Sequence, residues 1–262
     1  MKIGFIGSGN MGSALASAAA RASGTEVMIY DKDAEKAKAV AEALGASYAS
    51  LEKISAECDF VFLGVKPNII CSVADGLKDK LSEKAVVVSM AAGVKIAKIA
   101  SHLKLGTPII RIMPNTPVSV GAGMILWCAN EGVTEKTSAS FVATMSSAGC
   151  FDKIDEEKID AASAVSGCGP AFAYMFIEAL ADGAVECGLP REQAQKYAAQ
   201  TILGAAKLVL ESGKHPGELK DAVCSPGGST IAGVHALEDG AFRASASDAV
   251  VAAYERTLEL GK

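Results

Sequence analysis

Apolar residues in the first half of the chain gather into short continuous runs, separated by longer stretches with a helical pattern. The runs are Lys2–Ile6, Val27–Asp31, Asp59–Val65 and Ala85–Met90, with two further candidates at Pro108–Met113 and Met124–Cys128. The helical stretches include Asn10–Ala22 and Ala34–Leu44. Apolar runs without alternation suit parallel strands that are buried on both faces. The pattern therefore predicts βαβ units and a doubly wound α/β sheet.

The strand pattern ends after about Asp155, and only helices are predicted beyond it. They are Ala171–Cys187, Arg191–Glu211, Thr230–Leu237 and Ala244–Leu260. We therefore expect a dinucleotide-binding domain in residues 1–155 and an all-helical domain in residues 156–262. The helix at 171–187 is apolar on most faces, which is more than a helical domain of this size can bury alone. This surplus predicts a homodimer that forms through the helical domain.

Composition excludes several classes of protein. A net charge of −5 argues against a nucleic-acid partner, which would require a basic excess. No run reaches the ~20 uninterrupted apolar residues of a membrane span, and glycines interrupt the apolar N-terminal segment, so we expect no signal peptide. Seven scattered cysteines without C-x-x-C indicate free thiols in a reducing cytoplasm. The three histidines lack the spacing of metal ligands, so no metal site is predicted.

A glycine-rich turn follows the first run. Gly7, Gly9 and Gly12 fit G-x-G-x-x-G, after a strand and at the start of a helix. Gly7 permits the tight turn, Gly9 lets the backbone approach a pyrophosphate, and Gly12 lets helix and strand pack closely. The free N–H groups of the helix then face the phosphates. The alternative, that these glycines serve only packing, fits the context less well.

Asp31 ends the second run about twenty residues after the last glycine. An acidic residue there commonly accepts hydrogen bonds from the adenosine ribose, which favours NADH and repels a 2′-phosphate. Lys32 and Lys36 would offset that repulsion. The alternative is that Asp31 caps the following helix, a position for which Asp33 competes.

Three further segments follow strand ends, where open α/β sheets bind ligands. They are 64–67, 90–93 and 111–117, the last with two prolines around Asn115. That rigid loop either holds the nicotinamide or is a structural turn. In the helical half, the turns 166–170 and 225–230 combine glycines and hydroxyl groups with helix N-termini. They form a carboxylate site, or else two flexible linkers.

Motifs spread over nearly the whole chain carry a family resemblance. They are FIGSGNMG at 5–12, VKP at 65–67, AAGV at 91–94, RIMPNTP at 111–117, SGCGPAFAY at 166–174, and HPGELKD with SPGGSTIAG between 215 and 233. With these motifs the chain resembles the pyrroline-5-carboxylate reductases, the last enzymes of proline synthesis. The last three motifs are far more specific than the glycine fingerprint.

The resemblance implies a Rossmann-type domain, then an all-helical dimerisation and substrate domain, in a cytoplasmic homodimer that in some members assembles into a ring. It implies hydride transfer from NADPH or NADH to the imine carbon of pyrroline-5-carboxylate, which gives L-proline. The cofactor residues it implies are Ile6, Gly7, Ser8, Gly9, Asn10 and Met11 at the pyrophosphate, and Gly64, Val65, Lys66, Pro67, Met90, Ala91 and Ala92 along the cleft.

The resemblance places the substrate on Gly228, Ser229 and Thr230. The family threonine that hydrogen-bonds the ring nitrogen falls on Thr230, the implied catalytic residue. An acidic residue near bound proline in some members aligns with Glu156.

This sequence departs from the family pattern at three positions. Cys168 replaces the usual serine, Ala222 replaces an asparagine of some members, and Asp31 puts the usual preference for NADPH in doubt. Two other functions stay open. A β-hydroxyacid dehydrogenase would need a catalytic lysine between 163 and 190, where there is none. A non-catalytic redox sensor that binds NAD(P) would have no need for the SPGGST turn.

Overall fold

A computed structural model of the chain describes residues 1–260 and separates into two compact units. The first unit contains Met1–Cys168 and the end of the last helix from Ala253, and the second contains Gly169–Ala252. The two units are described one at a time below. The domain boundary predicted between residues 155 and 156 stays a prediction.

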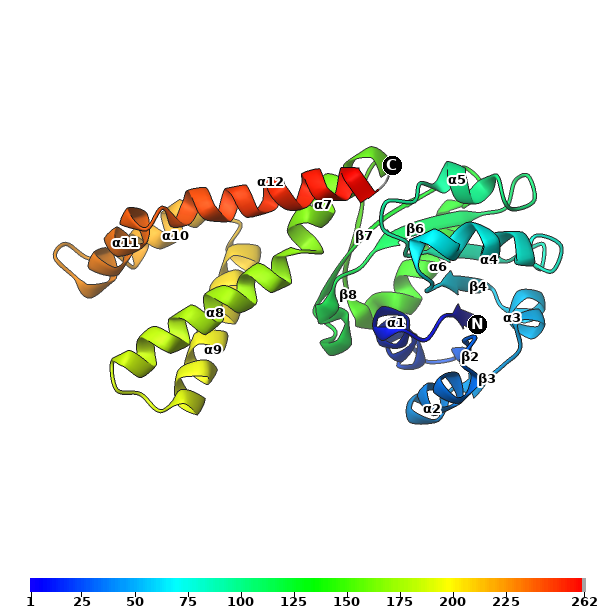
Figure 1. Cartoon of the computed structure of the whole chain (residues 1–262), viewed down its shortest axis with the longest axis horizontal. Coiled ribbons are helices and arrows are strands. Elements are labelled where there is room, and N and C mark those ends of the chain that lie inside the picture. Colours follow the sequence, from blue (N-terminus) through cyan, green and yellow to red (C-terminus); the bar gives the residue numbers. More distant parts are fainter. Residues whose placement is uncertain (261–262) are drawn as a thin grey trace. The chain divides into compact units, whose positions relative to one another are not determined.

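The first unit is built on one eight-stranded sheet with the order β3-β2-β1-β4-β5-β6-β7-β8 (Figure 1). The strands are β1 Lys2–Ile6, β2 Glu26–Tyr30, β3 Ser47–Tyr48, β4 Phe60–Leu63, β5 Val86–Ser89, β6 Ile109–Met113, β7 Gly123–Ala129 and β8 Gly149–Lys153. The first six are parallel, whereas β7 pairs antiparallel with β6 and parallel with β8. The carboxyl ends of β1, β4, β5 and β6 therefore meet at one edge of the sheet, which we call the carboxyl edge.

Helices cover both faces of this sheet. They are α1 Asn10–Ala20, α2 Ala34–Leu44, α3 Leu51–Glu57, α4 Ile70–Leu77, α5 Ile96–Ala100, α6 Glu135–Met145 and α7 Ile159–Ser166, with 3₁₀ turns η1 Pro67–Ile69, η2 Thr116–Val120, η3 Ser146–Ala148 and η4 Glu156–Lys158. Local sequence sets several of their ends. The Asp33 side chain caps α2 by accepting from the Lys36 amide, and Gly45 ends that helix with φ 63°.

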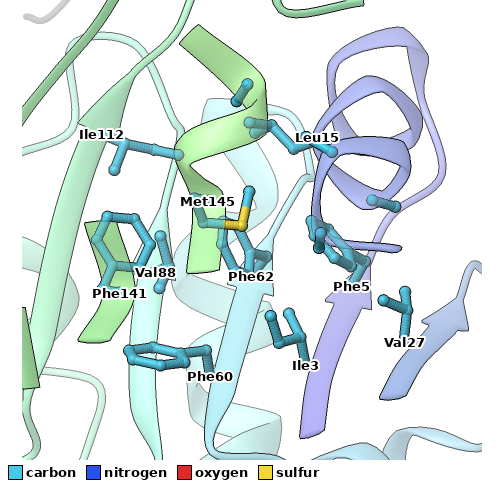
Figure 2. Packing of buried hydrophobic residues seen from close by; sticks show 14 of the residues in the cluster. Ile3, Phe5, Leu15, Val27, Phe60, Phe62, Val88, Ile112, Phe141 and Met145 are labelled. Atoms are coloured by element: carbon cyan, nitrogen blue, oxygen red, sulfur yellow. The ribbon is translucent and has the colours of Figure 1, made fainter. Parts of the chain in front are cut away.

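Two hydrophobic cores lie on opposite faces of the sheet because neighbouring strand residues point to opposite sides. Figure 2 shows the first core, where Phe5 and Phe62 stack on adjacent strands at a centroid distance of 4.5 Å, with Leu15 of α1 and Phe141 of α6 around them. The second core contains the alternate strand residues, such as Leu63, and side chains of α3, α4, α5 and α7. Burial on both faces confirms the predicted doubly wound sheet.

The second unit contains helices only. They are α8 Gly169–Glu186, α9 Arg191–Ser212, α10 Pro216–Ala222, α11 Ser229–Asp239 and α12 Phe242–Leu260, the last of which continues past the unit's end. Helices α8 and α9 lie side by side (Figure 1) and enclose a small core of Ala181, Ala194 and Ala198. Among the described residues after 155 there is no strand, which confirms the all-helical second half.

Large apolar side chains on the second unit stay exposed in the single chain. Met175 is 69% exposed and Leu210 is 84% exposed. By length and composition, the helical stretch Glu156–Glu186 is also apolar enough to cross a membrane. In the single chain, 11% of its most apolar segment is buried. The core helix of a soluble protein passes the same test, so this is weak evidence for a membrane span. Such exposed apolar surface is typical of a helical domain that needs a second copy to cover it.

Candidate functional site

The Gly7–Gly12 turn has no room for side chains at two of its glycines. Gly7 has φ +106°, and a Cβ there would lie 2.5 Å from the Gly64 carbonyl oxygen. A Cβ on Gly12 would lie 2.4 Å from the Gly7 carbonyl oxygen. In both cases the obstacle is backbone, which cannot swing away. Without side chains at Gly7 and Gly12, the backbones of β1, α1 and the end of β4 approach closely, and the first N–H groups of α1 lie at the carboxyl edge.

A cavity of about 800 Å³ opens at this turn. Of the predicted cofactor residues, its lining includes Ile6, Gly7, Gly9, Asp31, Gly64, Val65 and Lys66. A Cβ on Gly9 would meet no atom within 4 Å, so it would stand in open space at the cavity wall. Gly9 is also the N-cap of α1 and offers no side-chain cap. Open space beside uncapped N–H groups fits the pyrophosphate of a dinucleotide.

The other predicted cofactor residues lie at the same strand ends without lining this cavity. They are Ser8, Asn10, Met11 and Gly12 in the turn, Pro67 after β4, Met90, Ala91 and Ala92 after β5, and Asn115 after β6. Ser8 is almost fully buried, and Ala91 is buried with its amide donating to the Ser89 hydroxyl at 3.3 Å. Their places along one edge follow from the parallel pairing of β1, β4, β5 and β6.

Asp31 ties the end of β2 to the glycine turn. Its Oδ2 accepts hydrogen bonds from the Ser8 amide at 2.7 Å and from the Ser8 hydroxyl at 2.9 Å, and its Oδ1 accepts from the Asp33 amide at 3.1 Å. Partial burial alone would raise the pKa of the Asp31 carboxyl, but these hydrogen bonds and the charge of Lys36 outweigh it and lower the pKa. Asp33, and not Asp31, is the N-cap of α2.

Glu156 faces a buried arginine that the sequence analysis did not single out. Its Oε1 accepts from the Arg111 Nη1 at 3.2 Å and from the Ile96 amide at 2.7 Å. Arg111 is 1% exposed, and its Nη2 donates to Asp160 Oδ1 at 2.9 Å. One arginine in the otherwise apolar strand 109–113, with acidic residues at the next domain start, was the signal that could have revealed this cluster.

Asn115 is 8% exposed, and both ends of its amide have protein partners. Its Nδ2 donates to the Ser166 carbonyl at 2.8 Å, and its Oδ1 accepts from the Met124 amide at 2.9 Å. The side chain therefore joins the loop after β6 to the end of α7.

The turn at 225–230 leads into the N-terminus of α11. The Gly228 amide donates to the Ser225 carbonyl at 3.0 Å, and Gly227 takes φ +70°. Gly228 is the N-cap of α11 and supplies no side-chain cap, so Ser229 and Thr230 open the helix with free N–H groups. Both residues are exposed. This arrangement can accept a carboxylate and present a hydroxyl beside it.

Comparisons with known proteins agree over the whole chain. The family model described as pyrroline-5-carboxylate reductase dimerisation matches residues 156–260, and the model described as NADP oxidoreductase coenzyme F420-dependent matches residues 2–93. Pyrroline-5-carboxylate reductase of Escherichia coli is 41% identical, covering 100% of this chain and 98% of that protein. The Arabidopsis thaliana reductase is 42% identical, covering 100% of this chain and 96% of that protein.

A solved structure also matches over the whole chain. The Plasmodium falciparum pyrroline carboxylate reductase, solved with NADP bound, superposes with a TM-score of 0.89 at 34% identity, covering 100% of this chain and 98% of that one.

Proposed function

The chain belongs to the pyrroline-5-carboxylate reductase family, and from this premise we propose which of its residues carry the reaction. The reaction is the reduction of L-1-pyrroline-5-carboxylate to L-proline, the last step of proline biosynthesis. Bound NAD(P)H would supply a hydride to the carbon of the C=N bond, which becomes C5 of proline, and the nitrogen of the protonated imine keeps its proton and becomes the amine of proline.

The cofactor residues lie in the first unit. The N–H groups at the start of α1, beside Gly9, face the pyrophosphate, and the backbone of 64–67 and 90–92 lines the path toward the nicotinamide. Asp31 meets the adenosine ribose while it holds Ser8 in place. The open space at Gly9 and the obstructed positions of Gly7 and Gly12 support this assignment.

The substrate residues lie at the N-terminus of α11. The N–H groups of Ser229 and Thr230 take the carboxylate of the imine, and the absence of a capping side chain on Gly228 leaves these groups free to do so. The Thr230 hydroxyl orients the ring nitrogen. A protonated imine is already electrophilic, so the site needs to align two reactants and needs no strong general acid. This uncapped helix N-terminus is the observation that carries the proposal.

For Glu156 and Asn115 we propose roles other than the ligand contacts predicted from the sequence. Every contact that the structure gives the Glu156 carboxylate goes to Arg111 or to the Ile96 amide, which offers no support for a substrate contact. Asn115 has both ends of its amide committed to Ser166 and Met124. We propose that neither side chain touches a ligand.

The chain is a homo-oligomer, because its helical half is a pyrroline-5-carboxylate reductase dimerisation domain. The exposed apolar side chains of the second unit, such as Met175, supply surface for this contact. We propose a dimer as the basic unit, a ring of dimers as its assembly and the cytoplasm as its location. Light scattering of the purified protein distinguishes a monomer, a dimer and a larger ring.

The test of the proposed function is cofactor oxidation by the purified protein. We expect NADH or NADPH to be consumed only when pyrroline-5-carboxylate is present, with proline as product. A protein that binds NADH but leaves it unoxidised in the presence of the imine would be the redox sensor. Oxidation of 3-hydroxy acids with NAD⁺, without imine reduction, would identify a β-hydroxyacid dehydrogenase.

A further inference from the structure

Helix α7 is held at its first turn by a buried ion pair. Arg111, in the middle of β6, reaches Asp160 in the first turn of α7 and Glu156 in the preceding turn η4. Glu156 also accepts from the Ile96 amide at the N-terminus of α5. Because the guanidinium is almost fully buried, water competes little for these contacts. The start of α7 is therefore fixed against the sheet.

The same strand holds the other end of α7. Four residues after Arg111, the Asn115 amide binds the carbonyl of Ser166, the last residue of α7, at 2.8 Å. The contacts at Asp160 and Ser166 lie six helical residues apart, about 9 Å along α7, so β6 and the loop after it hold both ends of the helix. Asn115 is itself fixed by the Met124 amide of β7.

The position of Ser166 matters for the chemistry. Asn115 follows the carboxyl end of β6, which is parallel to β1 and β4, so Ser166 and the following Gly167 and Cys168 lie at the carboxyl edge that also carries the glycine turn. The Ser166 hydroxyl oxygen is buried without a hydrogen-bond partner among the described residues. The Gly167 and Cys168 amides donate to the Ser163 carbonyl at 2.7 and 3.2 Å, which ties them to α7, and the Asn115 contact ties this end of α7 to the loop after β6.

We propose that Asn115 is a positioning residue, which sets the Ser166–Cys168 segment at the reacting end of the cofactor cleft through its hydrogen bond to the Ser166 carbonyl. This inference rests on the proposed reduction of the cyclic imine. It assigns Asn115 no contact with the nicotinamide, and it predicts that loss of the contact impairs turnover while cofactor affinity stays intact.

The chain supplies a matched control in Asn130. Its amide bridges the opposite end of β6 in the same manner, since Nδ2 donates to the Thr107 carbonyl at 2.9 Å and Oδ1 accepts from the Ile109 amide at 2.9 Å. Asn115→Asp replaces a buried donor by an oxygen of the same shape, and Asn130→Asp does the same to a half-buried donor. Each variant should lose some thermal stability, and only the first should lose function.

The experiment measures three quantities on wild type and both variants. They are kcat and KM for pyrroline-5-carboxylate, the Kd for NADH without substrate, and the deuterium exchange of amides 163–168. For Asn115→Asp we expect kcat/KM to fall at least about 10-fold, the NADH Kd to change less than about 2-fold, and exchange to accelerate about 2–10-fold, as for one lost hydrogen bond. Asn130→Asp should leave all three near wild type.

Equal activity losses in the two variants would overturn the proposal, as would unchanged exchange at 163–168 in Asn115→Asp. A weaker NADH Kd that matches the whole loss of kcat/KM would show a direct cofactor contact and would also overturn it. An inactive wild type would instead refute the proposed function, and the exchange measurement would still test the Asn115 contact. If Asn115→Asp does not fold, Asn115→Ala and Asn130→Ala introduce no buried charge and give the same comparison.

Discussion

Replacement of Asp31 by serine tests how the chain chooses between NADH and NADPH. The Asp31 carboxylate lines the cavity at the glycine turn beside Lys32 and Lys36, at the end of β2 where we propose that the adenosine ribose binds. Its negative charge opposes a 2′-phosphate and favours a free 2′-hydroxyl. We therefore expect wild type to prefer NADH or to use both cofactors about equally, and Asp31→Ser to shift toward NADPH.

Two effects set the size of the shift, and both favour NADPH in the variant. Two unit charges about 4 Å apart repel by about 1 kcal/mol in water and about 4 kcal/mol near a protein surface. The cavity is open to solvent and two lysines stand nearby, so the repulsion between Asp31 and a 2′-phosphate is about 1–2 kcal/mol. Loss of the charged acceptor for the ribose costs NADH a further ~1 kcal/mol. Together these give a shift of about 30–200-fold in the ratio of kcat/KM values.

The ratio is the quantity to measure because Asp31 also holds Ser8. Loss of the Ser8 hydrogen bonds loosens the glycine turn, where we propose that the pyrophosphate binds. NADH and NADPH carry the same pyrophosphate, so this effect cancels in the ratio. Asp33→Ser is the matched control. It removes an equal charge two residues away, and serine retains the capping role on α2. A strong preference for NADPH in wild type, or an equal shift in both variants, would show that the Asp31 carboxylate does not set the cofactor preference.

Four further predictions follow. Thr230→Ala should lower kcat/KM for the imine about 10–100-fold, the loss of one oriented hydrogen bond, and an unchanged value in steady-state assays would remove the residue from the mechanism. Gly12→Ala should weaken NADH binding in fluorescence titrations at least about 10-fold, because its Cβ collides with the Gly7 carbonyl; unaltered affinity would contradict that geometry. Arg111→Met should destabilise the protein by about 3 kcal/mol in urea, since two carboxylates lose their buried partner, and a neutral effect would argue against that pairing. Burial raises the pKa of the Cys58 thiol to about 12, so iodoacetamide at pH 8 should label it only after unfolding, as mass spectrometry can check.

Hydrophobic patterning predicted the parallel part of the sheet well. The runs 2–6 and 108–113 became β1 and β6 with at most one residue of difference, because central strands buried on both faces must be apolar throughout. Strands β3 and β8 were not predicted. The first has two residues, and the second reads Gly-Cys-Phe-Asp-Lys at the edge of the sheet, where mixed side chains are tolerated.

The sequence likewise predicted one part of the candidate site and missed another. Backbone geometry is encoded locally, so the roles of Gly7 and Gly12 follow from the G-x-G-x-x-G spacing and agree with the close contacts in the structure. Side-chain partners depend on tertiary packing. Nothing local in the sequence indicates that Asn115 contacts residue 166. The lone arginine in an apolar strand signals a buried ion pair, but not that its partner is Glu156, 45 residues later in the chain.

This chain reduces a cyclic imine by direct hydride transfer from NAD(P)H. The direct test follows deuterium into the product from NADH or NADPH that carries deuterium at both C4 positions. We expect one deuterium at C5 of proline for each cofactor oxidised, and the α-carbon should keep the L configuration of the imine supplied. Cofactor oxidation without labelled proline, or no oxidation by folded protein, would contradict it.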